Sequence, residues 1–86
     1  MSSYNIVGNL EAVALPVAVI SDRRLSAADL GVYTRFVYAA TMWTYPDLEV
    51  LVREFRMPRE ETEAALLRLE AFGILEEMPD HSGSVS

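Results

Sequence analysis

Residues 47–75 have the sequence DLEVLVREFRMPREETEAALLRLEAFGIL, and this stretch determines the fold expected for the whole chain. Its first half places apolar side chains at the spacing of an amphipathic helix: Leu48, Leu51, Val52 and Phe55. Pro58 suits the first position of a second helix, because the N–H that proline lacks would have no partner there. Gly73 stands where helices often end in a left-handed residue. The stretch therefore predicts two short helices joined by a tight turn at residues 56–58.

The second predicted helix has an apolar face of its own, made of Thr62, Ala65, Leu66, Leu69 and Phe72. Two short helices joined by so tight a turn constitute a helix-turn-helix. The opposite face of the second helix holds Glu60, Glu63, Ala64, Leu67 and Ala71. In DNA-binding proteins with this motif, the outward face of the second helix enters the major groove.

The length and composition of the chain indicate one domain, residues 1–86, with residues 1–5 and 79–86 expected to be flexible. Hydrophobic residues make up 51% of the sequence. A domain this small cannot bury so much apolar surface, so we expect some of it to meet a second copy, in a homodimer, or a protein partner. The chain has no cysteine, and its one histidine, His81, lies in a Gly/Ser tail, so we expect no metal and no cofactor.

The charge balance is acidic, with a net charge of −6, and all seven basic residues are arginine. An acidic domain repels the phosphate backbone at long range, which disfavours strong nonspecific binding of nucleic acid. The longest apolar run, residues 12–20, is too short to span a bilayer. We therefore expect a cytoplasmic protein without a membrane partner.

A longer helix is predicted to begin at Ser26, because Ser26 and Asp29 have the spacing of a capping box. It is expected to run to about Met42, and Arg35 is the only charged residue in residues 30–46. A helix that is apolar nearly all round is buried on nearly all sides. We expect it to be central, with the helix-turn-helix on one face and the amino-terminal segment or a second copy on the other.

Three segments have the character of short strands. Residues 12–20 are rich in β-branched side chains, although Pro16 confines such a strand to an edge. Gly8 and Asn9, between apolar residues, indicate a hairpin before it. Residues 74–78 are predicted to form a strand and residues 79–83 a turn, which leaves only residues 84–86 to return along it.

This order of elements resembles a winged helix. The segments LPVAVISDRRLSAADLGVYTRFVYAA (residues 15–40) and PREETEAALLRLEAFGIL (residues 58–75) are similar to the winged-helix domains of phage replisome organisers, DnaD-like replication initiators and small bacterial winged-helix regulators. The most specific part is the ending L-x-x-L-x-x-x-G-I-L at residues 66–75. The resemblance covers roughly residues 15–77 and implies a mainly α fold: three helices, a small β-sheet with short amino-terminal strands, and a short carboxy-terminal wing.

The resemblance also implies a DNA-binding regulator of transcription or replication, from a bacterium or phage, that acts as a homodimer on double-stranded DNA. Arginine side chains would contact its phosphates. The candidates are Arg23, Arg24, Arg53, Arg56, Arg59 and Arg68. The alternative is that the arginines near the turn are solvated and paired with neighbouring glutamates, and the sequence leaves both interpretations open.

A second hypothesis is an acidic module for protein interaction or dimerisation that does not bind DNA on its own. Glutamates in the first turn of the second helix complement its dipole but oppose phosphate. Leu67, between Ala64 and Ala71, forms a narrow apolar stripe on the face expected to meet solvent. The candidate interface residues are Val13, Leu15, Val17, Ala64, Leu67 and Ala71. We expect no enzymatic activity, because the sequence has no Gly-rich phosphate loop and no nucleophile with a base nearby.

Overall fold

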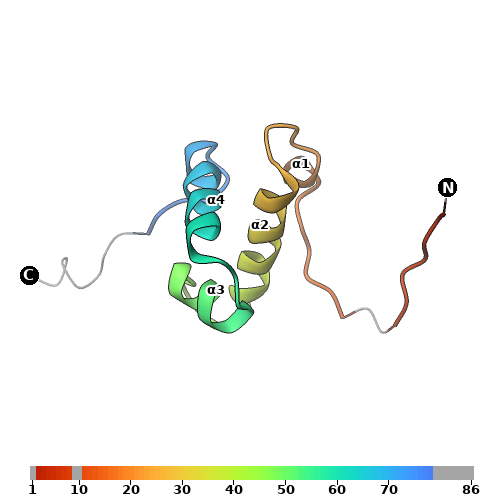
Figure 1. Ribbon diagram of the computed structural model, residues 1–86, viewed down its shortest axis with the longest axis horizontal. Helices are drawn as coiled ribbons and strands as arrows, with labels where there is room; N and C mark the ends of the chain where they lie inside the picture. Colours follow the sequence, from red (N-terminus) through yellow and green to blue (C-terminus); the bar gives the residue numbers. More distant parts are fainter. Residues whose placement is uncertain (1, 9–10, 79–86) are drawn as a thin grey trace, which may run out of the picture.

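Four helices account for the regular structure of residues 2–8 and 11–78, the parts of the chain that the computed structural model describes (Figure 1). They are α1 (Val17–Ile20), α2 (Ala27–Ala39), α3 (Leu48–Phe55) and α4 (Arg59–Ala71). α4 packs against α2 and α3, and α2 also contacts α3. The amino-terminal segment and α1 lie on the side of α2 that faces away from α4 (Figure 1).

The expected β-sheet is not present, because residues 2–8 and 11–78 contain no strand. A mainly α chain is therefore correct, whereas the prediction of a winged helix with a small sheet is wrong for this part of the chain. Residues 79–86, to which the sequence assigns the turn and returning strand of the wing, lie outside the described residues, as do Asn9 and Leu10 of the expected hairpin.

The expected edge strand at residues 12–20 is replaced by an extended segment and the short helix α1. Pro16 directs the chain into this helix, because its carbonyl accepts hydrogen bonds from the N–H groups of Val19 and Ile20 at 3.1 Å each. β-Branched residues favour a strand only where cross-strand neighbours are available, and no described segment offers them. Leu15 and Val19 instead pack against the helical core.

The start of α2 confirms the predicted capping box. The N–H of Asp29 donates to Ser26 Oγ at 3.0 Å, and the N–H of Ser26 donates to Asp29 Oδ2 at 3.2 Å. The helix ends at Ala39, earlier than the expected Met42, because a turn closes there with Trp43 N–H donating to the carbonyl of Ala39 at 2.9 Å.

Burial of α2 is more one-sided than its sequence predicts. Val32, Tyr33 and Ala39 are buried, but Tyr38 is exposed and several other apolar side chains of the helix are only half-buried. The face toward α3 and α4 is covered as expected. The expectation of burial on nearly all sides is wrong for the single chain, because the amino-terminal segment covers only part of the other face.

The predicted turn between the two later helices is confirmed. Asp47 caps α3, with its carboxylate accepting from the N–H of Val50 at 3.0 Å. Arg56 then adopts the left-handed conformation, with φ 53° and ψ 41°. Pro58 is the N-cap of α4, with ψ 129°, and not its first helical residue. Its carbonyl accepts both the N–H and the hydroxyl of Thr62, at 3.0 and 2.6 Å, which satisfies the hydroxyl of this buried residue.

The end of α4 is a Schellman motif. Gly73 is left-handed, with φ 75°, as its position in the sequence predicts. The N–H of Ile74 donates to the carbonyl of Leu69 at 2.9 Å, and that of Gly73 donates to the carbonyl of Glu70 at 3.0 Å. Ile74 and Leu75 are half-buried against the core. The strand expected at residues 74–78 is therefore wrong: this segment is held by the helix terminus and by packing, not by a neighbouring strand.

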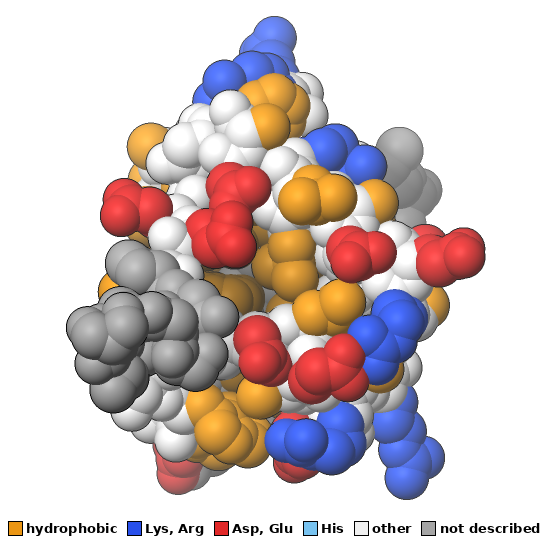
Figure 2. Space-filling view, turned by 90° about the vertical axis from the view of Figure 1, so that its left-hand side faces the viewer, with side chains coloured by type: hydrophobic (Ala, Val, Ile, Leu, Met, Phe, Trp, Pro, Cys, Tyr) orange, Lys and Arg blue, Asp and Glu red, His pale blue; other side chains and the backbone are white. Residues whose placement is uncertain are grey.

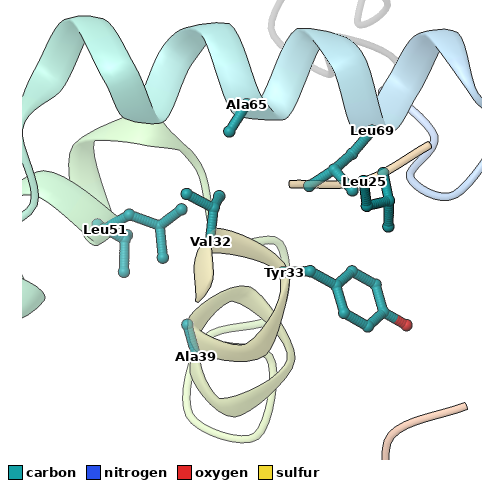
Figure 3. Packing of buried hydrophobic residues seen from close by; sticks show 8 residues of the cluster. Leu25, Val32, Tyr33, Ala39, Leu51, Ala65 and Leu69 are labelled. Atoms are coloured by element: carbon teal, nitrogen blue, oxygen red, sulfur yellow. The ribbon is translucent and has the colours of Figure 1, made fainter. Parts of the chain in front are cut away.

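The core lies where the three longer helices meet (Figure 3). Ala65 and Leu69 point from α4 toward Val32 of α2 and Leu51 of α3 (Figure 3). Leu51, Ala65 and Leu69 have no exposed surface. Full burial of a leucine side chain contributes about 1.5–3 kcal/mol relative to leaving it exposed, so these contacts hold the helix-turn-helix against α2.

The left-handed turn yields a first prediction. Replacing Arg56 by glycine should raise the free energy of unfolding by about 0.5–1 kcal/mol, because glycine adopts positive φ without the steric strain of a side chain. Urea denaturation measures the change. Glu54→Gly, inside α3, is the control and should lower stability, because glycine is a poor helix former. Destabilisation by Arg56→Gly would show that the Arg56 side chain itself stabilises the turn.

Candidate functional site

Four of the six candidate DNA-binding arginines form ion pairs with acidic residues of the same chain. The pairs are Arg24–Asp22, Arg53–Glu54, Arg59–Glu49 and Arg68–Asp29. Three of them are surface pairs, and such pairs contribute little to stability. They still matter for function, since a phosphate would have to compete with a carboxylate that is already in place.

The pair between Arg59 and Glu49 joins the first residues of α4 to α3. Arg59 donates from both terminal nitrogens, Nη1 to Oε2 at 2.5 Å and Nη2 to Oε1 at 2.7 Å. Hydrogen bonding from Arg59 holds the pKa of Glu49 below its ordinary value. Arg59 lies at the position from which a recognition helix would contact DNA, and here it crosslinks two helices.

The pair between Arg68 and Asp29 is the most buried of the four. Asp29 is only 1% exposed. Its Oδ1 accepts from Arg68 Nε at 3.0 Å and from Nη2 at 2.7 Å. The hydrogen bonds from Arg68 lower the pKa of the Asp29 carboxyl, while burial acts in the opposite direction. Arg68 therefore connects α4 to the start of α2, and about half of the Arg68 side-chain surface is exposed to solvent.

Arg24 connects the loop after α1 with the end of α4. Its guanidinium lies 4.6 Å from the centroid of the Phe72 ring, and its Nη2 is 2.7 Å from Asp22 Oδ2. Side-chain and backbone hydrogen bonds from Arg24 lower the pKa of Asp22 to about 2. Stacking on the ring and pairing with the carboxylate both fix this arginine on its own chain.

Arg23 and Arg56 are the remaining candidates, and both are exposed without an ion pair to any described residue. Arg23 lies in the loop between α1 and α2, and Arg56 in the turn between α3 and α4. Figure 1 places this loop and this turn at opposite ends of α2. The structure does not gather the six candidate arginines into one surface.

The candidate interface residues fall into two groups. On α4, Leu67 is 60% exposed, Ala71 is exposed and Ala64 is half-buried, so the apolar stripe does face solvent. In the amino-terminal segment, Val17 is 77% exposed and Val13 is also exposed. Leu15 differs from these, because it packs against the core of its own chain.

The described residues form a groove of about 880 Å³ that the sequence does not predict. Its sides come from the end of α2, the link from α2 to α3, the second half of α4 and the segment after Gly73. The lining residues are Phe36, Ala40, Thr44, Tyr45, Pro46, Asp47, Leu48, Leu66, Glu70, Ile74, Leu75, Glu76, Glu77 and Met78. Figure 2 shows the side of the molecule that carries α4 and the carboxy-terminal segment, where carboxylates surround hydrophobic side chains at a hollow.

The charges on the groove have one sign. Its lining includes four acidic residues, Asp47, Glu70, Glu76 and Glu77, and no basic one. Glu70, Glu76 and Glu77 form no ion pair with an arginine of the described chain. The groove, with an apolar lining and an unneutralised acidic rim, is the candidate functional site.

Sequence reasoning missed this groove because two of its walls lie in segments without a helical pattern. One wall is formed by residues 44–47, which link α2 to α3, and another by residues 74–78, for which the sequence predicts a strand. One signal was present: apolar residues persist in Ile74, Leu75 and Met78 after the helix has ended, and Glu76 and Glu77 interrupt them.

Residues 2–8 and 11–78 contain no group of three or more His, Cys, Asp or Glu side chains placed to hold a metal ion. None of the helices in these ranges is long and apolar enough to cross a membrane. Comparison with protein families, curated proteins and solved structures yields no match to this chain.

The buried pair yields a prediction about pH. Because folding lowers the pKa of Asp29 below its ordinary 3.8, the pair stabilises the fold fully well above pH 3.8 and loses this contribution as the pH falls through the folded-state pKa. Asp29→Asn should therefore be less stable than the wild type at pH 7, by about 1–3 kcal/mol. Urea denaturation should show this difference shrinking below about pH 4.

Glu63→Gln is the control for that titration, because Glu63 is exposed and forms no ion pair within the described chain. It should lose less than about 0.5 kcal/mol of stability at pH 7. A difference between Asp29→Asn and the wild type that stays constant between pH 7 and pH 3 would mean that the charge of Asp29 does not stabilise the fold.

Proposed function

We propose that this chain is an acidic protein-interaction module built on a helix-turn-helix, which associates with itself and does not bind DNA on its own. The observation that carries the proposal is the distribution of charge. Four of the six candidate arginines are held by acids of their own chain, whereas acidic and apolar side chains are left on the outside. The cytoplasm is the proposed location, as expected from the sequence.

The exposed residues of α4 argue against docking on DNA. Glu60, Glu61 and Glu63 are exposed in the half of α4 that would lie deepest in a major groove. Glutamate can accept a hydrogen bond from cytosine, but several carboxylates close to phosphates cost affinity unless arginines offset them. Arg59 and Arg68 lie on the same helix as these glutamates, but they already form ion pairs with Glu49 and Asp29.

Exposed apolar side chains support association with protein. Leu67 is 60% exposed on the outward side of α4, where it lies between Ala64 and Ala71. Val17 and Ile20 of α1 are also exposed. A homodimer that covers one of these surfaces would reconcile the high hydrophobic content with the small core.

The absence of DNA binding is directly testable. A mixed-sequence duplex should not shift in an electrophoretic mobility assay at about 50 mM salt, where electrostatic attraction to phosphate is near its strongest. A specific and salt-dependent shift would overturn the proposal in favour of a DNA-binding regulator. In that event Arg56→Ala, which removes a free cation, should weaken binding to all sequences and lower the salt slope by about one.

The dimer yields a separate prediction. In sedimentation equilibrium at tens of micromolar, the wild type should exceed the 9.6 kDa of one chain, and Leu67→Glu should reduce it to that mass. The variant should lose less than about 0.5 kcal/mol of stability, because Leu67 lies outside the core. Its matched control is Leu69→Ala, which truncates a fully buried leucine and should cost ~2–5 kcal/mol.

Two results would contradict this prediction. A wild type that sediments as a single chain would remove the homodimer from the proposal. A folded Leu67→Glu variant that remains associated would place the contact on another surface, for which Val17→Glu is the next variant to measure.

A further inference from the structure

We infer that the groove between the end of α2 and the second half of α4 binds a positively charged amphipathic helix of another protein. This inference rests on the proposed function as an interaction module and specifies one partner of that module. It concerns a surface separate from Leu67, which does not line the groove.

The shape and lining of the groove fit such an occupant. Its volume of about 880 Å³ lies within the roughly 300–1,000 Å³ typical of clefts that hold ligands. Phe36, Leu66 and Ile74 provide apolar surface that a row of apolar side chains can cover. An extended peptide would need a free strand edge, and residues 2–8 and 11–78 form none. A groove between helices with an apolar lining suits the mode in which a helix lays its apolar face in such a groove.

The acidic residues of the groove determine the sign of the charge that the partner must carry. Asp47 lies where the link meets α3, while Glu76 and Glu77 lie beyond the end of α4, so carboxylates come from different walls. Lysine or arginine on either side of the apolar stripe of the partner would meet these acids. The described lining supplies no cation, and Glu70, Glu76 and Glu77 form no ion pair with a described residue, so the attraction of these three carboxylates for a cation is not already satisfied there.

The same charges disfavour other occupants. A second copy carries a net charge of −6 and would bring repulsion to an acidic rim. The sequence of residues 79–86, PDHSGSVS, has one acid, no lysine or arginine, and Val85 as its only aliphatic side chain. It does not have the chemistry to cover an apolar groove and neutralise its rim. A phosphate-bearing ligand or an anionic membrane is repelled in the same way.

The test uses three synthetic fluorescent peptides of about 14 residues, roughly four helical turns. The first has leucines at i, i+3, i+4 and i+7 spacing with lysines on both flanks. The second keeps the leucines and replaces each lysine by glutamate. The third has the composition of the first in an order that breaks the helical stripe. Fluorescence anisotropy with the wild-type chain should show binding of the first peptide only, weakened as salt rises from about 50 to 500 mM.

Two charge-reversed variants locate the binding. Glu70→Lys combined with Glu76→Lys should weaken binding of the first peptide about tenfold or more, equivalent to about 1.4 kcal/mol. The matched control is Glu11→Lys combined with Glu63→Lys, which changes the net charge equally at exposed positions outside the groove. It should weaken binding less than about threefold. Circular dichroism and thermal melts establish that both variants are folded.

A third measurement identifies the surface directly. In amide NMR spectra of the wild type, the first peptide should shift the signals of groove residues such as Ala40, Thr44 and Glu76, and not those of Glu60 or Glu63. The inference is overturned if the stripe-breaking peptide binds as well as the first, since that would be charge attraction alone. It is also overturned if both double variants weaken binding equally, or if the groove variant changes the oligomeric state, which would make the occupant a second copy.

These outcomes are distinct from failure of the proposed function. If no peptide binds at the groove, self-association through Leu67 is unaffected, because sedimentation equilibrium measures it without any peptide. Conversely, a chain that is monomeric and binds DNA at low salt would contradict the interaction module itself, whatever the peptides do.

Discussion

The carboxylate of Asp29 holds two parts of the fold at once. One of its oxygens accepts from the backbone N–H of Ser26 and helps to begin α2, and both accept from the guanidinium of Arg68 on α4. If this buried carboxylate lost either partner, an oxygen would remain without a hydrogen bond away from water, which would lower the stability of the fold. The start of α2 and the second half of α4 are therefore fixed together, and the apolar contacts of Val32, Leu51 and Leu69 form within that frame.

Local chemistry explains what the sequence predicted well and where it failed. The start of α2 was predictable because the capping box of Ser26 and Asp29 acts over four residues. The end of α4 was predictable because Gly73 adopts the positive φ that terminates it. Strands at residues 12–20 and 74–78 were not, because a strand requires a neighbouring strand and periodicity gives no information about one. For the site, the exposure of Leu67 followed from the helical wheel. The groove did not, because its walls meet only when the link and the carboxy-terminal segment are placed in space.

Charge is distributed unequally between the inside and outside of this fold. Arg59 and Arg68 each pair with an acid on another helix, and Arg24 lies over the Phe72 ring, so all three connect separate segments. The acids outnumber the arginines by 13 to seven, so a surplus of carboxylates is left facing solvent. This acidic outer surface is why we propose that the helix-turn-helix binds cationic partners and not nucleic acid.

The Schellman motif at Gly73 has a consequence for recognition. Its hydrogen bonds from Gly73 and Ile74 fix the direction in which residues 74–78 leave α4, and these residues are one wall of the groove. This wall is preorganised, so the proposed binding would cost less conformational entropy of the protein than ordering a loose segment would. A Cβ at Gly73 would meet no atom within 4 Å, and the obstacle to a side chain is the positive φ alone. Gly73 lines no part of the groove, yet its backbone conformation sets the position of this wall, so the proposed binding would depend on a residue that the ligand does not touch.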